Sequence, residues 1–214
     1  MPKILNRSLS GEAEILRWLY GKLPVPEVIA FTEDNENEYL LTGEIKGILS
    51  CDPSYKDNMP ELVRLLAEGL KMIHGLNIAG CPFDRSLDVK VKEAEYRVKN
   101  GLVNEDKFDA VRRGRKADDL FRELTATRPS NEELVFTHGD YCLPNIIISN
   151  GTISGFIDLG RGGIADRYQD LALAARSLAF NFDEKWIPLL FKEYGIENID
   201  YDRILFYQLL DEFS

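Results

Sequence analysis

The chain has 214 residues, of which 44% are hydrophobic and 29% are charged, and its formal net charge is −10. This length and apolar content suffice for a buried core, so we expect a single domain or one large domain with part of a second. The negative charge excludes a general nucleic-acid binder, which would carry a basic face, and is compatible with a cationic small-molecule substrate. No apolar stretch is long enough to span a membrane, and residues 1–10 contain no apolar run that would indicate a signal peptide.

The number and spacing of the cysteines indicate the redox state of the cellular compartment. Cys51, Cys81 and Cys142 are widely spaced and form no CxxC or Cys/His pattern. An odd number of scattered cysteines is typical of a reduced compartment, so we predict a cytoplasmic protein without a zinc site.

The N-terminal part of the sequence predicts a helix followed by two short strands. The helix is expected from Ser10, a suitable N-cap, to Tyr20, because its apolar residues recur at helical spacing. Strands are expected at residues 28–31 and 39–42, separated by an acidic turn. Two glycines then break the second strand, and we expect residues 43–47 to be a linker.

Helices dominate the rest of the sequence. The clearest pattern covers residues 60–74, where leucines recur at helical spacing between a proline and a glycine. Further helices are predicted at residues 87–99, 118–125, 168–180, 183–193 and 202–213. Residues 146–148 and 153–157 are predicted strands, and the Asn150-Gly151 dipeptide between them strongly favours a two-residue hairpin turn.

The predicted hairpin brings three polar side chains together. Asp140 and Asn145 precede its first strand, and Asp158 follows its second strand. A two-residue turn makes the strands antiparallel, so their outer ends meet. Two carboxylates and an amide oxygen at that end would form the oxygen-rich site that magnesium prefers.

The spacing of these residues matches that of the residues that carry out phosphoryl transfer in kinases. There, a catalytic-loop aspartate is followed five residues later by an asparagine, and a metal-binding aspartate comes after a hairpin. We therefore predict Asp140 as the catalytic base, and Asn145 and Asp158 as the Mg²⁺ ligands. His138 is expected to hold the loop by hydrogen bonds rather than to transfer protons, and His74 is expected to be structural.

The sequence around these residues resembles the aminoglycoside 3'-phosphotransferases, which share the protein-kinase-like fold. The matching segments cover nearly the whole chain, at residues 18–26, 81–84, 137–145, 154–161, 165–170 and 209–213. The resemblance implies an α+β, protein-kinase-like fold with a mainly helical C-terminal lobe, a small antiparallel hairpin and a truncated N-terminal lobe. It divides the chain into residues 1–45, a remnant of the N-terminal lobe with the hinge, and residues 46–214, the helical lobe with the catalytic and substrate-binding residues.

The resemblance also implies an activity, which is ATP-dependent transfer of phosphate to a sugar hydroxyl of a kanamycin- or neomycin-type antibiotic. Gly43 and Ile45 correspond to hinge backbone that meets adenine, and Ile157 corresponds to a residue packed under the base. The residues that would contact or support the cationic substrate lie late in the chain and are Arg161, Arg176, Asp211, Glu212 and Ser214, the last through the terminal carboxylate. Carboxylates suit a substrate with several ammonium groups.

The N-terminal part departs from the family pattern. No glycine-rich loop is present, and Glu12 falls where the family has a glutamate that pairs with a phosphate-gripping lysine. Lys3 is the only lysine before Lys22, and we do not expect it to substitute. Without these groups, we expect weak or no turnover, because positioning and charge stabilisation drive phosphoryl transfer.

The substrate side departs as well. Ala110 and Val111 stand where the family is usually acidic, and basic residues follow in segment 112–116. This run would either repel a polycation or form a solvated surface pointing elsewhere. The chain has Ser214 at the position where the family commonly has an aromatic residue.

Two other functions remain open from the sequence. One is a catalytically inactive homologue, in which apolar surface left by the short lobe is covered by a homodimer or by rearrangement. The other is a kinase of a different hydroxylated small molecule, favoured by the altered segment 110–116. The sequence does not decide between ATP and GTP.

Overall fold

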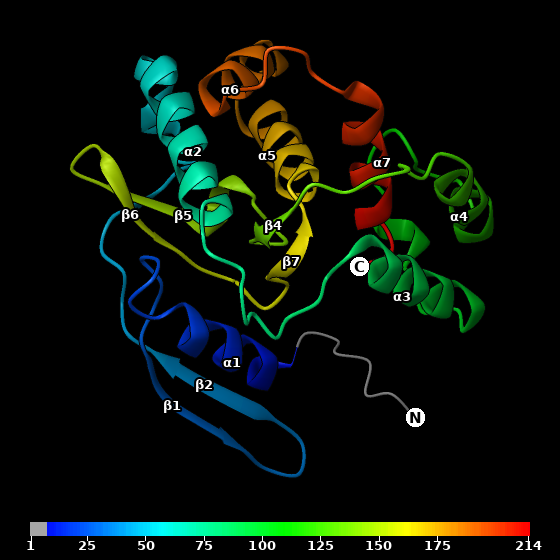
Figure 1. Ribbon diagram of the computed structural model, residues 1–214, viewed down its shortest axis with the longest axis horizontal. Helices are drawn as coiled ribbons and strands as arrows, with labels where there is room; N and C mark the ends of the chain where they lie inside the picture. Colours follow the sequence, from blue (N-terminus) through cyan, green and yellow to red (C-terminus); the bar gives the residue numbers. More distant parts are fainter. Residues whose placement is uncertain (1–7) are drawn as a thin grey trace.

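The computed structural model describes residues 8–214 and shows a small N-terminal layer beside a larger helical body (Figure 1). Lys3 lies outside the described residues. The helices are α1 (Leu9–Leu19), α2 (Met59–His74), α3 (Leu87–Lys99), α4 (Ala117–Ala126), α5 (Tyr168–Asn181), α6 (Ile187–Tyr194) and α7 (Tyr201–Asp211). The strands are β1 (Val28–Glu33), β2 (Glu38–Thr42), β3 (Ile48–Leu49), β4 (Leu134–Thr137), β5 (Ile146–Ser149), β6 (Thr152–Phe156) and β7 (Gly163–Asp166).

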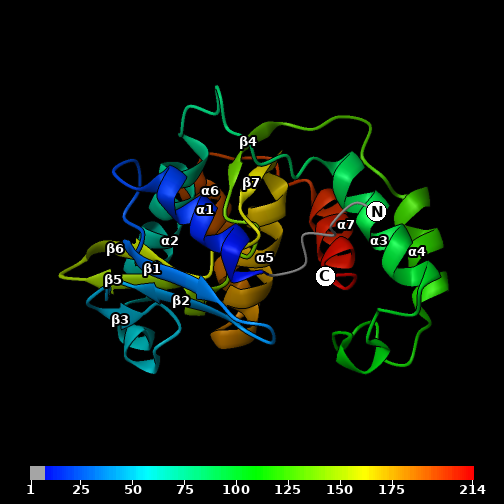
Figure 2. The ribbon, with the colours of Figure 1, turned by 90° about the horizontal axis from the view of Figure 1, so that it is seen from below.

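The N-terminal layer consists of α1 and the antiparallel pair β1–β2 (Figures 1 and 2). The N-cap of α1 is Ser8, whose hydroxyl accepts a hydrogen bond from the Gly11 backbone N–H at 3.1 Å. The prediction of Ser10 as N-cap is therefore wrong, because the earlier serine already caps the first turn. Residues 43–47 contain no helix or strand, as predicted.

The predicted hairpin is confirmed and has a third strand. Asn150 and Gly151 have φ values of 52° and 72°, the left-handed pair that a two-residue turn of type I′ requires. The sequence did not predict β3, a strand of only two residues that pairs with β5. The hairpin is also tied to the N-terminal layer, because the Phe156 N–H donates to the Pro24 carbonyl at 2.9 Å and the Ser154 hydroxyl donates to the Lys46 carbonyl at 2.7 Å.

A second small ladder joins β4 to β7. The strands are antiparallel and pair Leu134 with Asp166 through to Thr137 with Gly163. Sequence reasoning did not predict this pair, because both strands have only four residues and β7 contains only one large apolar residue. This ladder ends where the His138-Gly139-Asp140 loop begins, so it sets the position of that loop.

The helical body is built around α2, α5, α6 and α7, with α3 and α4 standing to one side (Figure 2). Helix α2 buries its leucine stripe as predicted, and α3 has the predicted bounds. Helix α6 begins later than predicted, because a short 3-10 turn over residues 184–186 is capped by Asp183. Within residues 8–214, no helix is both long and apolar enough to cross a bilayer.

The two layers share one hydrophobic core. Ile15, Leu16 and Leu19 of α1 are buried together with side chains of the helical body. Trp18 stacks on Phe136 of β4 with ring centroids 5.2 Å apart. The outer face of β1–β2 is different, because its apolar side chains are exposed and include Ile29 at 59% and Leu41 at 57%.

Candidate active site

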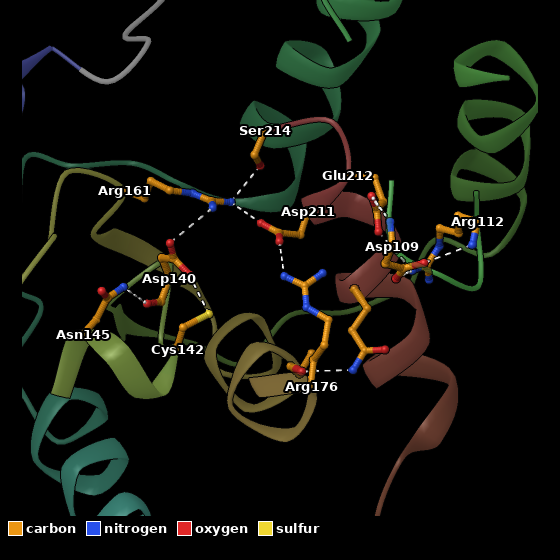
Figure 3. A network of polar contacts seen from close by, with 12 residues as sticks. Asp109, Arg112, Asp140, Cys142, Asn145, Arg161, Arg176, Asp211, Glu212 and Ser214 are labelled. Carbon is orange, nitrogen blue, oxygen red and sulfur yellow. Dashed lines mark hydrogen bonds and ion pairs between the residues drawn. The ribbon is translucent and has the colours of Figure 1, made fainter. Parts of the chain in front are cut away.

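A glycine shapes the loop that follows β4. Gly139 has a φ of 83°, and a Cβ atom built on it would lie 2.1 Å from the Arg161 carbonyl oxygen. Only glycine tolerates both the backbone conformation and this close approach. The turn directs Asp140 toward Arg161 (Figure 3).

A buried carboxylate holds this loop from below. Asp170 of α5 accepts hydrogen bonds from the backbone N–H groups of His138 at 2.7 Å and Gly139 at 2.9 Å. His74 lies 3.1 Å from the same carboxylate. Burial alone would raise the pKa of Asp170, but the hydrogen bond from His74 and the backbone hydrogen bonds outweigh it and lower the pKa. Sequence reasoning did not single out this residue, since a carboxylate within a helix carries no local sign of burial.

The two histidines have structural roles, as predicted. His138 is fully buried, and its Nε2 donates to the Ile157 carbonyl at 3.0 Å while its Nδ1 accepts from the Asp140 N–H at 3.3 Å. Burial lowers the pKa of His138, which favours this neutral form. His74 bridges Asp170 and the Tyr194 hydroxyl.

Two groups lie against the Asp140 carboxylate, a third contacts its backbone carbonyl, and the carboxylate remains partly open to solvent. The Cys142 thiol donates to its Oδ1 at 2.9 Å, and Arg161 Nη1 lies 3.9 Å from its Oδ2 (Figure 3). The Asn145 side-chain amide donates to the Asp140 backbone carbonyl at 3.0 Å. The side chain of Asp140 is 23% exposed, so a hydroxyl group can still approach the carboxylate.

The two predicted metal ligands come from either side of the hairpin. The Ile157 N–H donates to the Asn145 carbonyl at 3.0 Å, which ties the residue before Asp158 to Asn145. Asp158 is exposed and has a φ of 58°, a conformation uncommon outside glycine that often marks functional sites. Within residues 8–214, no three acidic, histidine or cysteine side chains converge as a metal site. An asparagine and one aspartate still fit Mg²⁺, which takes few protein ligands and completes its shell with water and phosphate oxygens.

Glu12 lies near Asp158. Burial and the charge of Asp158 raise the pKa of the Glu12 carboxylate. Among the ion pairs within residues 8–214, none involves Glu12.

The predicted nucleotide-binding residues lie in segment 43–45 and just after β6. The Gly43 N–H donates to the Glu27 carbonyl at 2.8 Å, which fixes the end of β2. The Ile45 side chain packs directly on Gly155 of β6, where a built Cβ atom would lie 2.3 Å from its Cδ1. Ile157, which follows β6, is half-buried. Ile45 and Ile157 therefore border the same end of the hairpin.

Four of the five predicted substrate residues, Arg176, Asp211, Glu212 and Ser214, line a cavity of about 500 Å³. The fifth, Arg161, lies between Asp211 of this cavity and Asp140. Asp211 accepts hydrogen bonds from both Arg161, at 2.5 Å, and Arg176. Burial would raise the pKa of Asp211, but the two guanidinium groups hold it at about 2. Arg161 also donates to the Ser214 hydroxyl at 2.7 Å (Figure 3). The cavity is lined by Arg97, Asn104, Lys107, Asp109, Arg176, Asp211, Glu212 and Ser214.

The sequence left open whether the basic residues of segment 112–116 face the substrate or form a solvated surface, and the structure shows some of each. Arg112 turns inward and pairs with Asp109 and, at 3.3 Å, with Glu212. Arg115 and Lys116 instead form exposed ion pairs on the outside. Sequence reasoning missed Arg112 as a site residue, although an aspartate three positions before an arginine was a signal for a local ion pair.

The chain is also similar to proteins of one enzyme family. A family model described as "Phosphotransferase enzyme family" matches residues 2–207. The chain belongs to this family. An aminoglycoside 3'-phosphotransferase of Niallia circulans is 39% identical over 217 residues, which cover 99% of this chain and 81% of the relative.

Solved structures within the family have the same fold. The crystal structure of an aminoglycoside-3'-phosphotransferase of type VIII has a TM-score of 0.86 and 35% identity, over 96% of this chain and 80% of that chain. A Streptomyces rimosus aminoglycoside phosphotransferase in complex with ADP and streptomycin has a TM-score of 0.86 and 30% identity, over 100% of this chain and 84% of that chain. The predicted protein-kinase-like α+β fold is thus confirmed.

Proposed function

We propose that this protein transfers the terminal phosphoryl group of a nucleoside triphosphate to a sugar hydroxyl of an aminoglycoside. The observation that carries the proposal is the convergence of Asp140, Asn145 and Asp158 around one hairpin, in a chain of the phosphotransferase family. The relatives named above, aminoglycoside phosphotransferases, support the acceptor class.

In this proposal, Asp140 is the catalytic base. The acceptor oxygen forms a bond to the terminal phosphorus, the bond from that phosphorus to the bridging oxygen breaks, and the nucleoside diphosphate leaves. Asp140 accepts the hydroxyl proton. The hydrogen bond from Cys142 and the proximity of Arg161 orient the Asp140 carboxylate for that transfer.

The remaining residues bind the nucleotide and its metal. Asn145 and Asp158 would hold Mg²⁺, which neutralises charge on the phosphates when bound. Gly43 and Ile45 would contact the base from the hinge, and Ile157 would pack beneath it. We propose ATP as the nucleotide and a hinge at the boundary between residues 1–45 and 46–214.

The acceptor would occupy the cavity beside Asp140. Asp211, Glu212 and Ser214 would face the acceptor, with Arg161 and Arg176 supporting the pocket. The three lining carboxylates are compatible with a cationic substrate.

A kinase of a different hydroxylated small molecule is the second candidate, favoured by Arg112 beside Glu212.

The test combines the protein with MgATP and kanamycin or neomycin and detects phosphorylated drug by mass spectrometry. Product that disappears in Asp140→Asn, with Asp202→Asn as a matched surface control, would support the proposal. No product at protein concentrations near those of the drug would contradict it and favour an inactive homologue or another acceptor.

Two further proposals concern the setting of the enzyme. We place it in the cytoplasm, where ATP is available and Cys51, Cys81 and Cys142 would stay reduced, as they are in this structure. We also propose a homodimer through the outer face of β1–β2, where Ile29 and Leu41 are exposed. A monomeric mass by light scattering at micromolar concentration would contradict the dimer.

A further inference from the structure

The three carboxylates that line the cavity are already paired with guanidinium groups. Asp211 lies between Arg161 and Arg176, and Asp109 and Glu212 share Arg112 (Figure 3). An acceptor ammonium group that enters this cavity therefore meets carboxylates whose charge is largely balanced.

Arg112 is firmly held in this position. Arg112 is only 7% exposed, and the side chain of Glu212 is 6% exposed. Beyond the two carboxylates, its Nη2 donates to the Leu205 carbonyl at 3.4 Å, and its backbone N–H donates to Asp109 Oδ1 at 3.0 Å. Displacing it would leave a buried charge without a partner, which is strongly unfavourable.

The position of Arg112 is specific within its basic run. Arg113 is exposed, and Arg115 pairs with Glu123 away from the cavity. Arg112 is thus the residue of this run that reaches both Asp109 and Glu212, and Arg113 offers a matched control of the same charge.

We infer that Arg112 determines acceptor specificity, because its guanidinium occupies the place of an ammonium group between Asp109 and Glu212. The acceptor therefore carries a hydroxyl group, rather than an ammonium group, where it reaches the end of the cavity formed by these two carboxylates. The inference rests on the proposed function and refines the substrate class of the same site. A second cation would be repelled by the guanidinium, whereas a hydroxyl carries no charge and can donate to one of the carboxylates.

The test uses two pairs of acceptors in which an ammonium group replaces a hydroxyl, namely neomycin with paromomycin and kanamycin B with kanamycin A. The measurement is kcat/KM with MgATP for the wild type, Arg112→Gln, Arg112→Met and Arg113→Gln. In at least one pair, we expect the wild type to use the hydroxyl-bearing acceptor at least as well as its partner. In that pair, either Arg112 variant should shift the ratio of the two kcat/KM values toward the ammonium-bearing acceptor by about tenfold, which corresponds to the free energy of one charge-assisted hydrogen bond. Arg113→Gln should leave this ratio unchanged.

The outcomes separate this inference from the proposed function. A wild type that prefers the ammonium-bearing acceptor in both pairs would overturn the inference without any variant. Ratios that move equally in Arg112→Gln and Arg113→Gln would also overturn it, since only net charge would then matter. Product from no acceptor with any of the four proteins would overturn the proposed function and, with it, this inference.

Discussion

The Asp170 carboxylate accepts a hydrogen bond from the Gly139 backbone N–H at 2.9 Å, across a separation of 31 residues in the sequence. One buried side chain of α5 thereby sets the turn that presents Asp140. The same carboxylate accepts the His138 N–H, so two successive backbone donors converge on it. Backbone groups buried in this way need an acceptor, and Asp170 provides it.

Replacing Asp170 by Asn should disrupt this loop. The amide can offer only one acceptor oxygen, and its NH₂ group would face a backbone donor or His74. We expect a loss of about 3–5 kcal/mol in the free energy of unfolding, as for other broken buried ionic networks. Urea denaturation would measure it, with exposed Asp202→Asn as the control, and a loss below about 1 kcal/mol would show that the carboxylate does not support the loop.

Gly139→Ala should be far more damaging than Gly151→Ala. Both glycines have positive φ, but a Cβ atom at Gly139 would meet the Arg161 backbone at 2.1 Å, while nothing lies within 4 Å of one at Gly151. We expect about 1 kcal/mol of backbone strain at Gly151 and at least about twice that loss at Gly139. Thermal unfolding of the two variants would measure both losses of stability. Equal losses would contradict the close approach of Gly139 to the Arg161 backbone.

Cys142→Ala should slow catalysis without unfolding the protein. It removes the thiol that donates to Asp140 Oδ1 at 2.9 Å. Loss of about 1 kcal/mol of hydrogen bonding corresponds to a fall in kcat of about fivefold. Cys142→Ser retains a donor and should recover part of the rate, whereas Cys51→Ser should have no effect. A serine variant as slow as the alanine variant would indicate a packing role instead.

The clearest successes of sequence reasoning come from local chemistry. The leucine spacing predicted α2, and the Asn150-Gly151 pair predicted the hairpin. Each of these signals lies within one continuous segment, where periodicity or turn preference is strong.

The missing features depend on contacts between distant segments. The β4–β7 ladder joins two four-residue strands that carry little periodicity of their own. The inward turn of Arg112 depends on Glu212, which lies 100 residues later. Nothing local distinguishes Arg112 from Arg113, so tertiary packing alone selects which arginine is buried.

The stability of the protein should depend on pH through Glu212. Burial and the neighbouring Asp109 raise the pKa of Glu212 from 4.5 to about 7. The folded state therefore holds this proton more tightly than the unfolded state, so the stabilising contribution is complete below about pH 4.5 and is lost as the pH rises through 7. We expect this group to remove roughly 1–3 kcal/mol over that interval.

Glu212→Gln isolates this effect from other carboxyl groups. The variant should show a smaller decline in the free energy of unfolding between pH 4.5 and pH 7 than the wild type. Denaturation curves at several pH values would measure the difference. Parallel declines in the two proteins would mean that Glu212 titrates normally.

The stacking of Trp18 on Phe136 gives the molecule an optical reporter. The chain has two tryptophans, and Trp18 lies on α1 against the strand that leads into the catalytic loop, with Lys22 Nζ 3.4 Å from its ring centroid. In a Trp186→Phe variant, Trp18 would be the only tryptophan fluorophore. Its emission would then follow the docking of the N-terminal layer directly, and nucleotide that moves this layer would change the colour of the emitted light before any product forms.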